Sequence, residues 1–306
     1  MPLENYIQAN VGGVLCDARE GVISPLDRGF LYGDAIYEVW RTYNGVIFGW
    51  EEHWERLLAT AAGIGMTLEF SPKEILNEIR QTVAAWREMT RAVGDVYIRL
   101  QVSRGEGAIG LDTSFAVGQR YVILVKGLVD LESSVLDEGY KLSVCRKWKR
   151  NSIDALPPAL KTGNYLNNIL GLKEAHEKGA DDALFLNADG AITEASTRNV
   201  WFVFEDRIVT PALSDGLLAG VTRRLLLERV GKCAGRPLVE CSLSEEDLLG
   251  ATECFLSSST QDVQPVAEID GRAFALGEGT VTRELKSLFR MYVASSLQGR
   301  SDLEVS

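Results

Sequence analysis

Two Asn/Asp–Gly steps constrain the fold of this chain more than any other feature of its sequence. Asn44-Gly45 lies between the apolar runs Tyr37–Tyr43 and Val46–Trp50, and Asp189-Gly190 holds a similar place in the second half. Both residues of such a step tolerate positive φ, so they favour the two-residue turn that joins antiparallel strands. The sequence therefore predicts antiparallel β-hairpins in both halves of the chain.

Helical periodicity is found in other, separate segments. Glu51–Ala62 carries apolar residues at helical spacing, and Ser71-Pro72-Lys73-Glu74 combines an N-cap, a proline at the first helical position and a glutamate at the third. Further helices are expected after Gly163, Gly220, Ser244 and Gly279. Because strands gather in hairpins and helices in separate runs, we expect an α+β fold rather than a Rossmann-like array of βαβ units.

The segment Asp95–Ser103 alternates between apolar and polar residues, as a strand with two different faces does. Its even-numbered positions are apolar, whereas Tyr97, Arg99 and Gln101 share the other face. Antiparallel sheets often leave one face solvated. Arg99 is therefore either an exposed charge or a buried guanidinium that awaits a carboxylate, and Tyr121–Lys126 is a further strand.

A polar, acidic stretch interrupts the pattern between the two halves. It covers residues 127–139 and is interpreted as a linker. The chain of 306 residues is long enough for two domains of ordinary size. We therefore expect an N-terminal α/β domain over residues 1–126 and a C-terminal barrel-like domain over residues 140–306.

Composition narrows the class of partner. The formal net charge of −11 argues against nucleic acid, because phosphate binding needs clustered Lys and Arg. The five cysteines are scattered without CxxC spacing, so no zinc site and no disulfide framework is expected. The N-terminus lacks the basic and apolar regions of a signal peptide, and no apolar run approaches the roughly 20 residues that span a bilayer. These features predict a cytoplasmic protein without a membrane partner.

Lys161 follows a segment with two prolines and precedes an expected helix. A lysine at that place feels the positive end of the helix dipole, which favours its neutral, nucleophilic amine. Taken alone, a solvated surface lysine is the commoner interpretation. Glu194, between two expected strands, is in the same way either an exposed turn residue or a carboxylate able to keep a pyridine ring protonated.

Three features have the chemistry to hold a phosphate. Arg56 lies on the first amphipathic helix, and its fork suits bidentate contact. The amides of Val221 and Thr222 open a helix and would point at an anion. The run 257–260, Ser-Ser-Ser-Thr, offers four hydroxyls after a strand. Each also has an ordinary interpretation, as a surface arginine, a helix start or a polar turn.

Taken together, these segments resemble the fold-type IV (class IV) enzymes that depend on pyridoxal 5′-phosphate (PLP). This group includes branched-chain and D-amino-acid aminotransferases and aminodeoxychorismate lyase. The resemblance extends from Asp27–Asp34 to Gly277–Thr282, in the same order along the chain. It is most specific where Lys161 with Asn164-Tyr165-Leu166 is followed by Glu194 and then by Gly220–Arg223.

The resemblance implies roles for these residues. Lys161 would hold PLP as a Schiff base and move the proton between the substrate Cα and the cofactor. Glu194 would pair with the pyridine nitrogen, and Tyr165 would hydrogen-bond the phenolic oxygen of the ring. It also implies a homodimer whose active site lies in a cleft between the two domains. The remaining cofactor-binding positions are Arg56, Val221, Thr222, Ser258 and Ser259.

Substrate contacts are implied at five positions, and they favour the branched-chain group. Tyr97-Ile98-Arg99 and the loop Gly107–Asp112 are similar to that group, and no arginine follows Arg104-Gly105 where D-amino-acid aminotransferases place one. Two departures point the other way: Tyr37-Glu38-Val39 is closer to the D-amino-acid pattern, and Ser258-Ser259-Thr260 replaces Gly-Thr-Ala. The implied substrate-binding residues are Tyr32, Tyr37, Tyr97, Arg99 and Thr260.

The leading hypothesis is a transaminase that moves the amino group of branched-chain or other aliphatic L-amino acids to a 2-oxo acid such as 2-oxoglutarate. A D-amino-acid or (R)-amine transaminase and a lyase of the aminodeoxychorismate type remain alternatives within the fold. A non-enzymatic ligand sensor is a further alternative. It is disfavoured because a reactive lysine, a carboxylate for the ring nitrogen and a phosphate cup exceed what binding alone requires.

Overall fold

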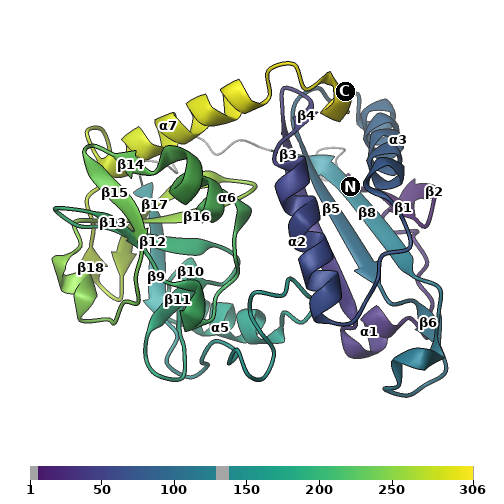
Figure 1. The fold of residues 1–306 in the computed structure, drawn as a ribbon, viewed down its shortest axis with the longest axis horizontal. Coiled ribbons are helices and arrows are strands. Elements are labelled where there is room, and N and C mark those ends of the chain that lie inside the picture. The colour runs from purple at the N-terminus through teal and green to yellow at the C-terminus, as the bar shows by residue number, and fades with distance from the viewer. Residues whose placement is uncertain (1–5, 129–137, 306) are drawn as a thin grey trace. The chain divides into compact units, whose positions relative to one another are not determined.

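The computed structural model describes residues 6–128 and 138–305, whose contacts divide the chain into two compact units (Figure 1). Unit 1 contains residues 6–128, 161–164 and 297–305, and unit 2 contains residues 138–160 and 165–296. Most of the expected linker, residues 127–139, lies outside the described residues. The division differs from the expected boundaries because the segment around Lys161 and the C-terminal residues pack with unit 1.

Unit 1 is built on an antiparallel sheet with the strand order β2-β1-β8-β5-β3-β4. A short pair, β6 (Glu106–Gly107) and β7 (Ala116–Val117), extends from it. The strands are β1 Gln8–Val11, β2 Val14–Asp17, β3 Ala35–Tyr43, β4 Val46–Ile47, β5 Val96–Ser103 and β8 Arg120–Gly127; the helices are α1 Arg28–Tyr32, α2 Trp50–Gly63 and α3 Pro72–Thr90, with 3-10 turns at Thr113–Phe115 and Ser301–Leu303.

The local signals in unit 1 are largely confirmed. Asn44 and Gly45 take φ of 50° and 80° between β3 and β4, as the hairpin turn requires. The capping box at α3 is present: Ser71 Oγ accepts from the amide of Glu74, whose carboxylate accepts from the amide of Ser71. The expected strand Val46–Trp50 is wrong in its second half, because Gly49 at φ 65° redirects the chain and Trp50 begins α2.

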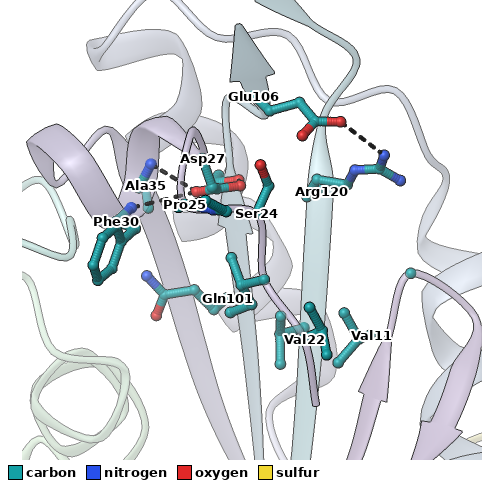
Figure 2. A pocket seen from close by; sticks show the side chains of 15 residues that line it. Val11, Val22, Ser24, Pro25, Asp27, Phe30, Ala35, Gln101, Glu106 and Arg120 are labelled. Carbon is teal, nitrogen blue, oxygen red and sulfur yellow. Dashed lines mark hydrogen bonds and ion pairs between the residues drawn. The ribbon is translucent and has the colours of Figure 1, made fainter. Parts of the chain in front are cut away.

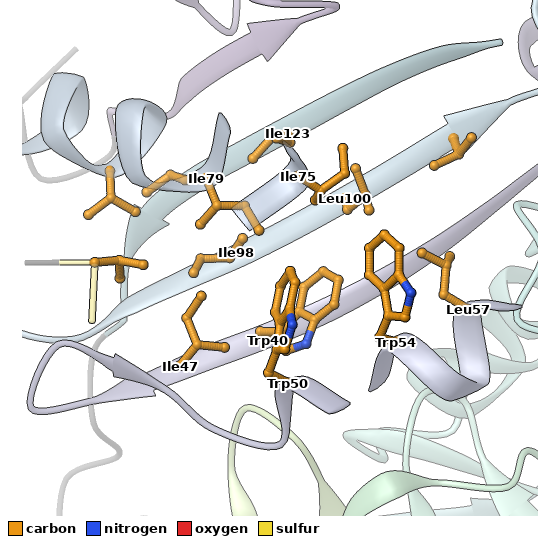
Figure 3. Close-up of a cluster of buried hydrophobic side chains, with 14 of the residues drawn as sticks. Trp40, Ile47, Trp50, Trp54, Leu57, Ile75, Ile79, Ile98, Leu100 and Ile123 are labelled. Carbon is orange, nitrogen blue, oxygen red and sulfur yellow. The ribbon is translucent and has the colours of Figure 1, made fainter. Parts of the chain in front are cut away.

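The core of unit 1 lies between one face of its sheet and the helices α2 and α3 (Figure 3). Trp50 stacks between Trp40 and Trp54, with ring centroids 5.1 and 5.7 Å apart. Ile98 and Leu100 of β5 are fully buried on the same face, as the alternation of this strand predicts. The opposite face of β5 therefore presents Tyr97, Arg99 and Gln101, which are half-buried.

Unit 2 is a mixed sheet that closes on itself. The strands run β11-β10-β9-β17-β16-β12, and β11 also pairs with β12, which completes a ring; β13, β15 and β14 continue from β12. The closing pair is Glu194 and Asn199. The strands are β9 Tyr140–Val144, β10 Asp182–Leu186, β11 Ile192–Ala195, β12 Asn199–Val203, β13 Ile208–Thr210, β14 Lys232–Cys233, β15 Arg236–Glu240, β16 Glu253–Ser258, β17 Asp262–Ile269 and β18 Arg272–Ala273.

Three of the four helix starts expected in unit 2 are confirmed. They are α5 Leu166–Glu177, α6 Val221–Leu225, which continues as one π-helical turn to Val230, and α7 Val281–Ser296. After Ser244 the structure has only a 3-10 turn, Asp247–Gly250, because the chain enters β16 three residues later. The α+β fold, with a smaller sheet unit and a larger barrel-like unit, is confirmed. Within the described residues, no helix combines the length and apolarity needed to cross a membrane.

Candidate active site

The backbone around Lys161 forms an additional edge strand on the sheet of unit 1. The amide of Tyr37 donates to the carbonyl of Lys161 at 3.1 Å, and the amide of Gly163 donates to the carbonyl of Ala35 at 2.8 Å. The Lys161 amide donates to Thr60 Oγ1 of α2 at 3.3 Å. These three bonds fix the lysine on β3, so its side chain starts from a rigid support rather than from a loop.

The side chain of Lys161 contacts Tyr37, and Arg99 contacts the same tyrosine. Lys161 Nζ donates to Tyr37 Oη at 3.0 Å and lies 4.2 Å from the centroid of the same ring. The guanidinium carbon of Arg99 lies 3.8 Å from that centroid, a distance typical of a cation–π contact. The structure thus brings together three residues that the sequence assigned to catalysis and substrate binding.

Arg56 takes part in a buried group on the helix-covered side of unit 1. Its Nε and one terminal nitrogen each donate to Glu38 at 2.7 Å, in a bidentate pair. His53 Nδ1 donates to the same carboxylate at 2.7 Å, since a carboxylate only accepts. Glu38 has no exposed surface. The pair fixes the direction of the Arg56 fork, and its contact with a phosphate stays a prediction.

Burial and charge act against each other in this group. Burial alone would raise the pKa of the Glu38 carboxyl, but the charge of Arg56 and the hydrogen bonds from Arg56 and His53 outweigh it and hold this pKa below its ordinary value. Burial lowers the pKa of His53 in spite of the neighbouring carboxylate. The group is therefore an ionised Glu38 and Arg56 with a neutral His53.

We expect Glu38→Ala to destabilise unit 1 by about 3–5 kcal/mol, because it leaves a half-buried guanidinium without its counter-ion. Because the folded pKa of Glu38 is depressed, its contribution is complete above the unfolded pKa, about 4.3, and is lost as the pH falls below it. Urea unfolding followed by tryptophan fluorescence measures this, since Trp40, Trp50, Trp54 and Trp86 report on unit 1. Glu88→Ala, at an exposed position of α3, is the control; equal midpoints for both variants at pH 7 would contradict the expectation.

Closure of the barrel determines the surroundings of Glu194 in unit 2. Asn199, its partner across the closing pair, donates to Oε2 at 3.3 Å, and the amide of Leu218 donates to the same oxygen at 3.2 Å. Arg150 donates to Oε1 through two nitrogens, each at 2.9 Å. Glu194 is 4% exposed. A buried carboxylate with this set of donors is held in one orientation.

Two features near this carboxylate suit an anion or a polar ligand. Gly220 precedes α6, and no side chain of the described residues caps that helix end. A side chain at 220 would collide with Asn199 Oδ1, since an added Cβ would come within 2.0 Å of it. Ser258 Oγ is buried without a hydrogen-bond partner among the described residues. A native buried hydroxyl is nearly always satisfied, so this one indicates a missing partner.

The other predicted residues have these places. Tyr32 Oη accepts from the amide of Gly110 at 3.0 Å, which fixes the loop Gly107–Asp112. The ring of Tyr97 lies under Lys126 Nζ at 5.3 Å. Tyr165 precedes α5, while Ser259 and Thr260 follow β16, and all three are half-buried. Their roles toward cofactor and substrate stay predictions.

A cavity of about 710 Å³ opens on unit 1, on the sheet face that bears Gln101 (Figure 2). Apolar side chains make up most of its wall, and several of them are strongly exposed, among them Val22, Ile23 and Phe30. Its polar rim includes Asp27 and the pair Glu106–Arg120. Gln101 belongs to this wall and also accepts a hydrogen bond from Arg99.

Sequence reasoning assigned no role to Glu38, His53, Arg150 or Gln101. Glu38 had a usable signal, because it stands between Ile36 and Trp40 on the apolar face of a strand, where a charge needs a partner. Arg150 had none: it lies 44 residues before Glu194, in a segment without regular structure.

Comparisons with known proteins agree with this geometry. The amino-transferase class IV family matches residues 35–269. A Methanocaldococcus jannaschii protein, provisionally described as a branched-chain-amino-acid aminotransferase, is 30% identical over 281 residues, with 92% of this chain and 94% of the relative covered. A D-alanine aminotransferase of Listeria monocytogenes is 31% identical over 290 residues, with 91% and 93% covered. The chain therefore belongs to the class IV aminotransferases and is a PLP-dependent transaminase.

Solved structures give the same family. The branched-chain aminotransferase of Thermoproteus uzoniensis with norvaline has a TM-score of 0.80 at 29% identity and covers 98% of this chain and 97% of its own. A second branched-chain aminotransferase, from T.th. and solved with pyridoxamine 5′-phosphate, has a TM-score of 0.83 at 26% identity, with 98% and 96% covered. Relatives of both specificities are thus similar to this chain at about the same identity.

Proposed function

We propose that this transaminase carries PLP on Lys161 and moves the amino group of branched-chain and other aliphatic L-amino acids to a 2-oxo acid such as 2-oxoglutarate. The observation that carries the proposal is the contact of Arg99 with the same ring, Tyr37, that binds Lys161 Nζ. This contact supports the proposal because a guanidinium suited to a carboxylate and the amine proposed to hold PLP contact the same side chain. The structures similar to this chain include one described with norvaline, an unbranched aliphatic amino acid.

The residues of the chain fit PLP. The cofactor supplies an electron sink for the carbanion that forms when the substrate loses its Cα proton. Ser258 Oγ, buried and without a partner among the described residues, suits a phosphate oxygen, and so do the amides of Val221 and Thr222. Arg56, directed by Glu38, would add a charged fork. Ser259 and Tyr165 complete the proposed set, through the phosphate and the phenolic oxygen.

The side chains would share the proton chemistry as follows. Lys161 would take the proton from the substrate Cα and return it to a carbon of the cofactor. The hydroxyl of Tyr37 accepts from this amine and orients it. Glu194, oriented by Arg150 and Asn199, would pair with the pyridine nitrogen and favour its protonated form. Tyr32, Tyr97 and Thr260 would contact the substrate.

A donor panel tests the stereochemistry. We expect L-leucine and L-norvaline to convert the bound cofactor to its amine form in a single-turnover half-reaction, seen as loss of the Schiff-base absorbance, whereas D-alanine leaves it unchanged. The second candidate is a D-amino-acid transaminase, which the D-alanine aminotransferase relative supports at 31% identity. Conversion by D-alanine alone would establish that candidate and refute ours. Pyruvate release from a chorismate-derived amine without an acceptor would identify a lyase.

We also propose that the enzyme is a homodimer and that a second copy covers the apolar wall of the unit 1 cavity. Val22 and Phe30 are 82% and 74% exposed there, and contiguous exposed apolar surface usually marks an interface. Sedimentation is expected to give a dimer for the wild type and a monomer for the double variant Val22→Asp, Phe30→Asp. Val93→Asp, at an exposed position outside the wall, is the control; a monomeric wild type would refute the proposal. The expected cytoplasmic location stays a prediction.

A further inference from the structure

Gln101 lies beside Tyr37, the residue that contacts both Arg99 and Lys161. It stands directly opposite Tyr37 in the pairing of β3 with β5, and it follows Arg99 by two residues on the same face of β5. Gln101 Oε1 accepts from a terminal nitrogen of Arg99 at 2.6 Å. The guanidinium is therefore held at two places, by the ring of Tyr37 beneath it and by the amide of Gln101 beside it.

The same side chain reaches the segment that carries Lys161. Gln101 Nε2 lies 3.3 Å from the position that a Cβ would take at Gly163, closer than an ordinary van der Waals contact. Only a glycine lets the two approach without displacement. Because the amide of Gly163 is bonded to β3, Gln101 lies close to a segment that also carries Lys161 and is held on the same sheet.

We propose that Gln101 is a specificity-determining residue, which orients Arg99 toward the distal carboxylate of a dicarboxylate substrate such as glutamate or 2-oxoglutarate. The inference rests on the proposed function. Gln101 acts through Arg99, so it is a positioning residue.

The chemistry of the pair supports this role. A guanidinium has five N–H donors, and one of them is used by Gln101. The partner is an amide, so it fixes the orientation of the fork and leaves the positive charge uncompensated. A carboxylate at position 101 would orient Arg99 equally well but would cancel the charge that attracts an anionic substrate. Among the described residues, no ion pair joins Arg99 to a carboxylate.

The place of Arg99 favours the distal rather than the α-carboxylate. The α-carboxylate is attached to the carbon that reacts, whereas the distal one is separated from it by further carbons. Arg99 lies against the ring of Tyr37, and Lys161 Nζ is bonded to the hydroxyl of that tyrosine, so one side chain joins the cation to the reactive amine. A cation that is joined to the amine through another side chain suits the far end of a five-carbon diacid.

Gln101→Met tests the inference, since it keeps the length of the side chain and removes the acceptor. We expect KM for 2-oxoglutarate and for L-glutamate to rise by about three- to tenfold, the usual effect of losing one charge-assisted hydrogen bond, with kcat unchanged. KM for L-leucine is expected to stay the same. Gln101→Glu keeps the acceptor but adds a charge, so it should weaken dicarboxylate binding more than Gln101→Met does.

Equilibrium binding gives a readout that does not depend on turnover. Glutarate, an unreactive dicarboxylate, should bind the PLP-loaded Gln101→Met enzyme with Kd raised by the same factor, and 4-methylvalerate with unchanged Kd. Gln81→Met, at an exposed position of α3, should change neither. Equal losses for both ligands, or none, would overturn the inference while leaving an active wild type as a transaminase. A wild type that converts no amino donor would instead refute the proposed function and, with it, this inference.

Discussion

Lys161→Ala is expected to lower kcat for transamination by about 10⁴-fold while both units stay folded. The change removes the amine that holds the cofactor and moves the substrate proton. It leaves the backbone bonds of this residue, through its amide to Thr60 and through its carbonyl to Tyr37, which keep the edge strand on β3. Rapid-mixing absorbance with L-leucine, on protein reloaded with PLP, measures the loss.

Lys149→Ala, an exposed lysine that precedes Arg150, is the matched control and should keep full activity. Two further results are expected if Lys161 holds the cofactor. Borohydride should attach the cofactor to the peptide that contains Lys161 in the wild type and to no peptide of the variant. A small amine such as methylamine should restore part of the lost proton transfer. Undiminished activity of Lys161→Ala would refute the assignment of the lysine.

Local sequence signals predicted the secondary structure where a single interaction decides the outcome. The capping box at Ser71 and Glu74 and the turn at Asn44-Gly45 each depend on neighbouring residues only, and both are confirmed. The strand expected over Val46–Trp50 was predicted too long, and here the outcome depends on contacts with residues elsewhere in the fold. Trp50 suits a strand by propensity, but Gly49 at φ 65° redirects the chain, and Trp50 packs between Trp40 and Trp54 as the first residue of a helix.

The candidate site was predictable as a set of residues but not as a set of contacts. Lys161, Tyr37 and Arg99 were each assigned, yet nothing in their spacing shows that one tyrosine ring contacts both cations. That contact exists because the segment around Lys161 pairs with β3, a tertiary event between residues more than a hundred positions apart. Arg150 and Glu194 are similarly joined by closure of the barrel, which periodicity does not reveal.

Glu194→Gln is expected to lower kcat by about 10²–10³-fold, the usual effect of removing one electrostatic contact to the developing charge. Glutamine keeps the shape of the side chain, but its single oxygen can accept either from Arg150 or from Asn199, because these donors use different oxygens of the carboxylate. It lacks the negative charge that keeps a pyridine nitrogen protonated, so the ring loses its capacity to withdraw electrons. Single-turnover rates with L-leucine and the absorbance spectrum of the loaded enzyme measure the change.

Two variants separate this role from a merely structural one. Glu174→Gln alters another hydrogen-bonded carboxylate of unit 2, which accepts from the amide of Arg146 and from Lys178, and it should leave kcat unchanged. Arg150→Met leaves the charge of Glu194 in place but removes the two donors that fix Oε1. We expect it to lower kcat by about tenfold, less than Glu194→Gln does. A larger loss in Arg150→Met than in Glu194→Gln would mean that the orientation of the carboxylate, rather than its charge, controls the ring.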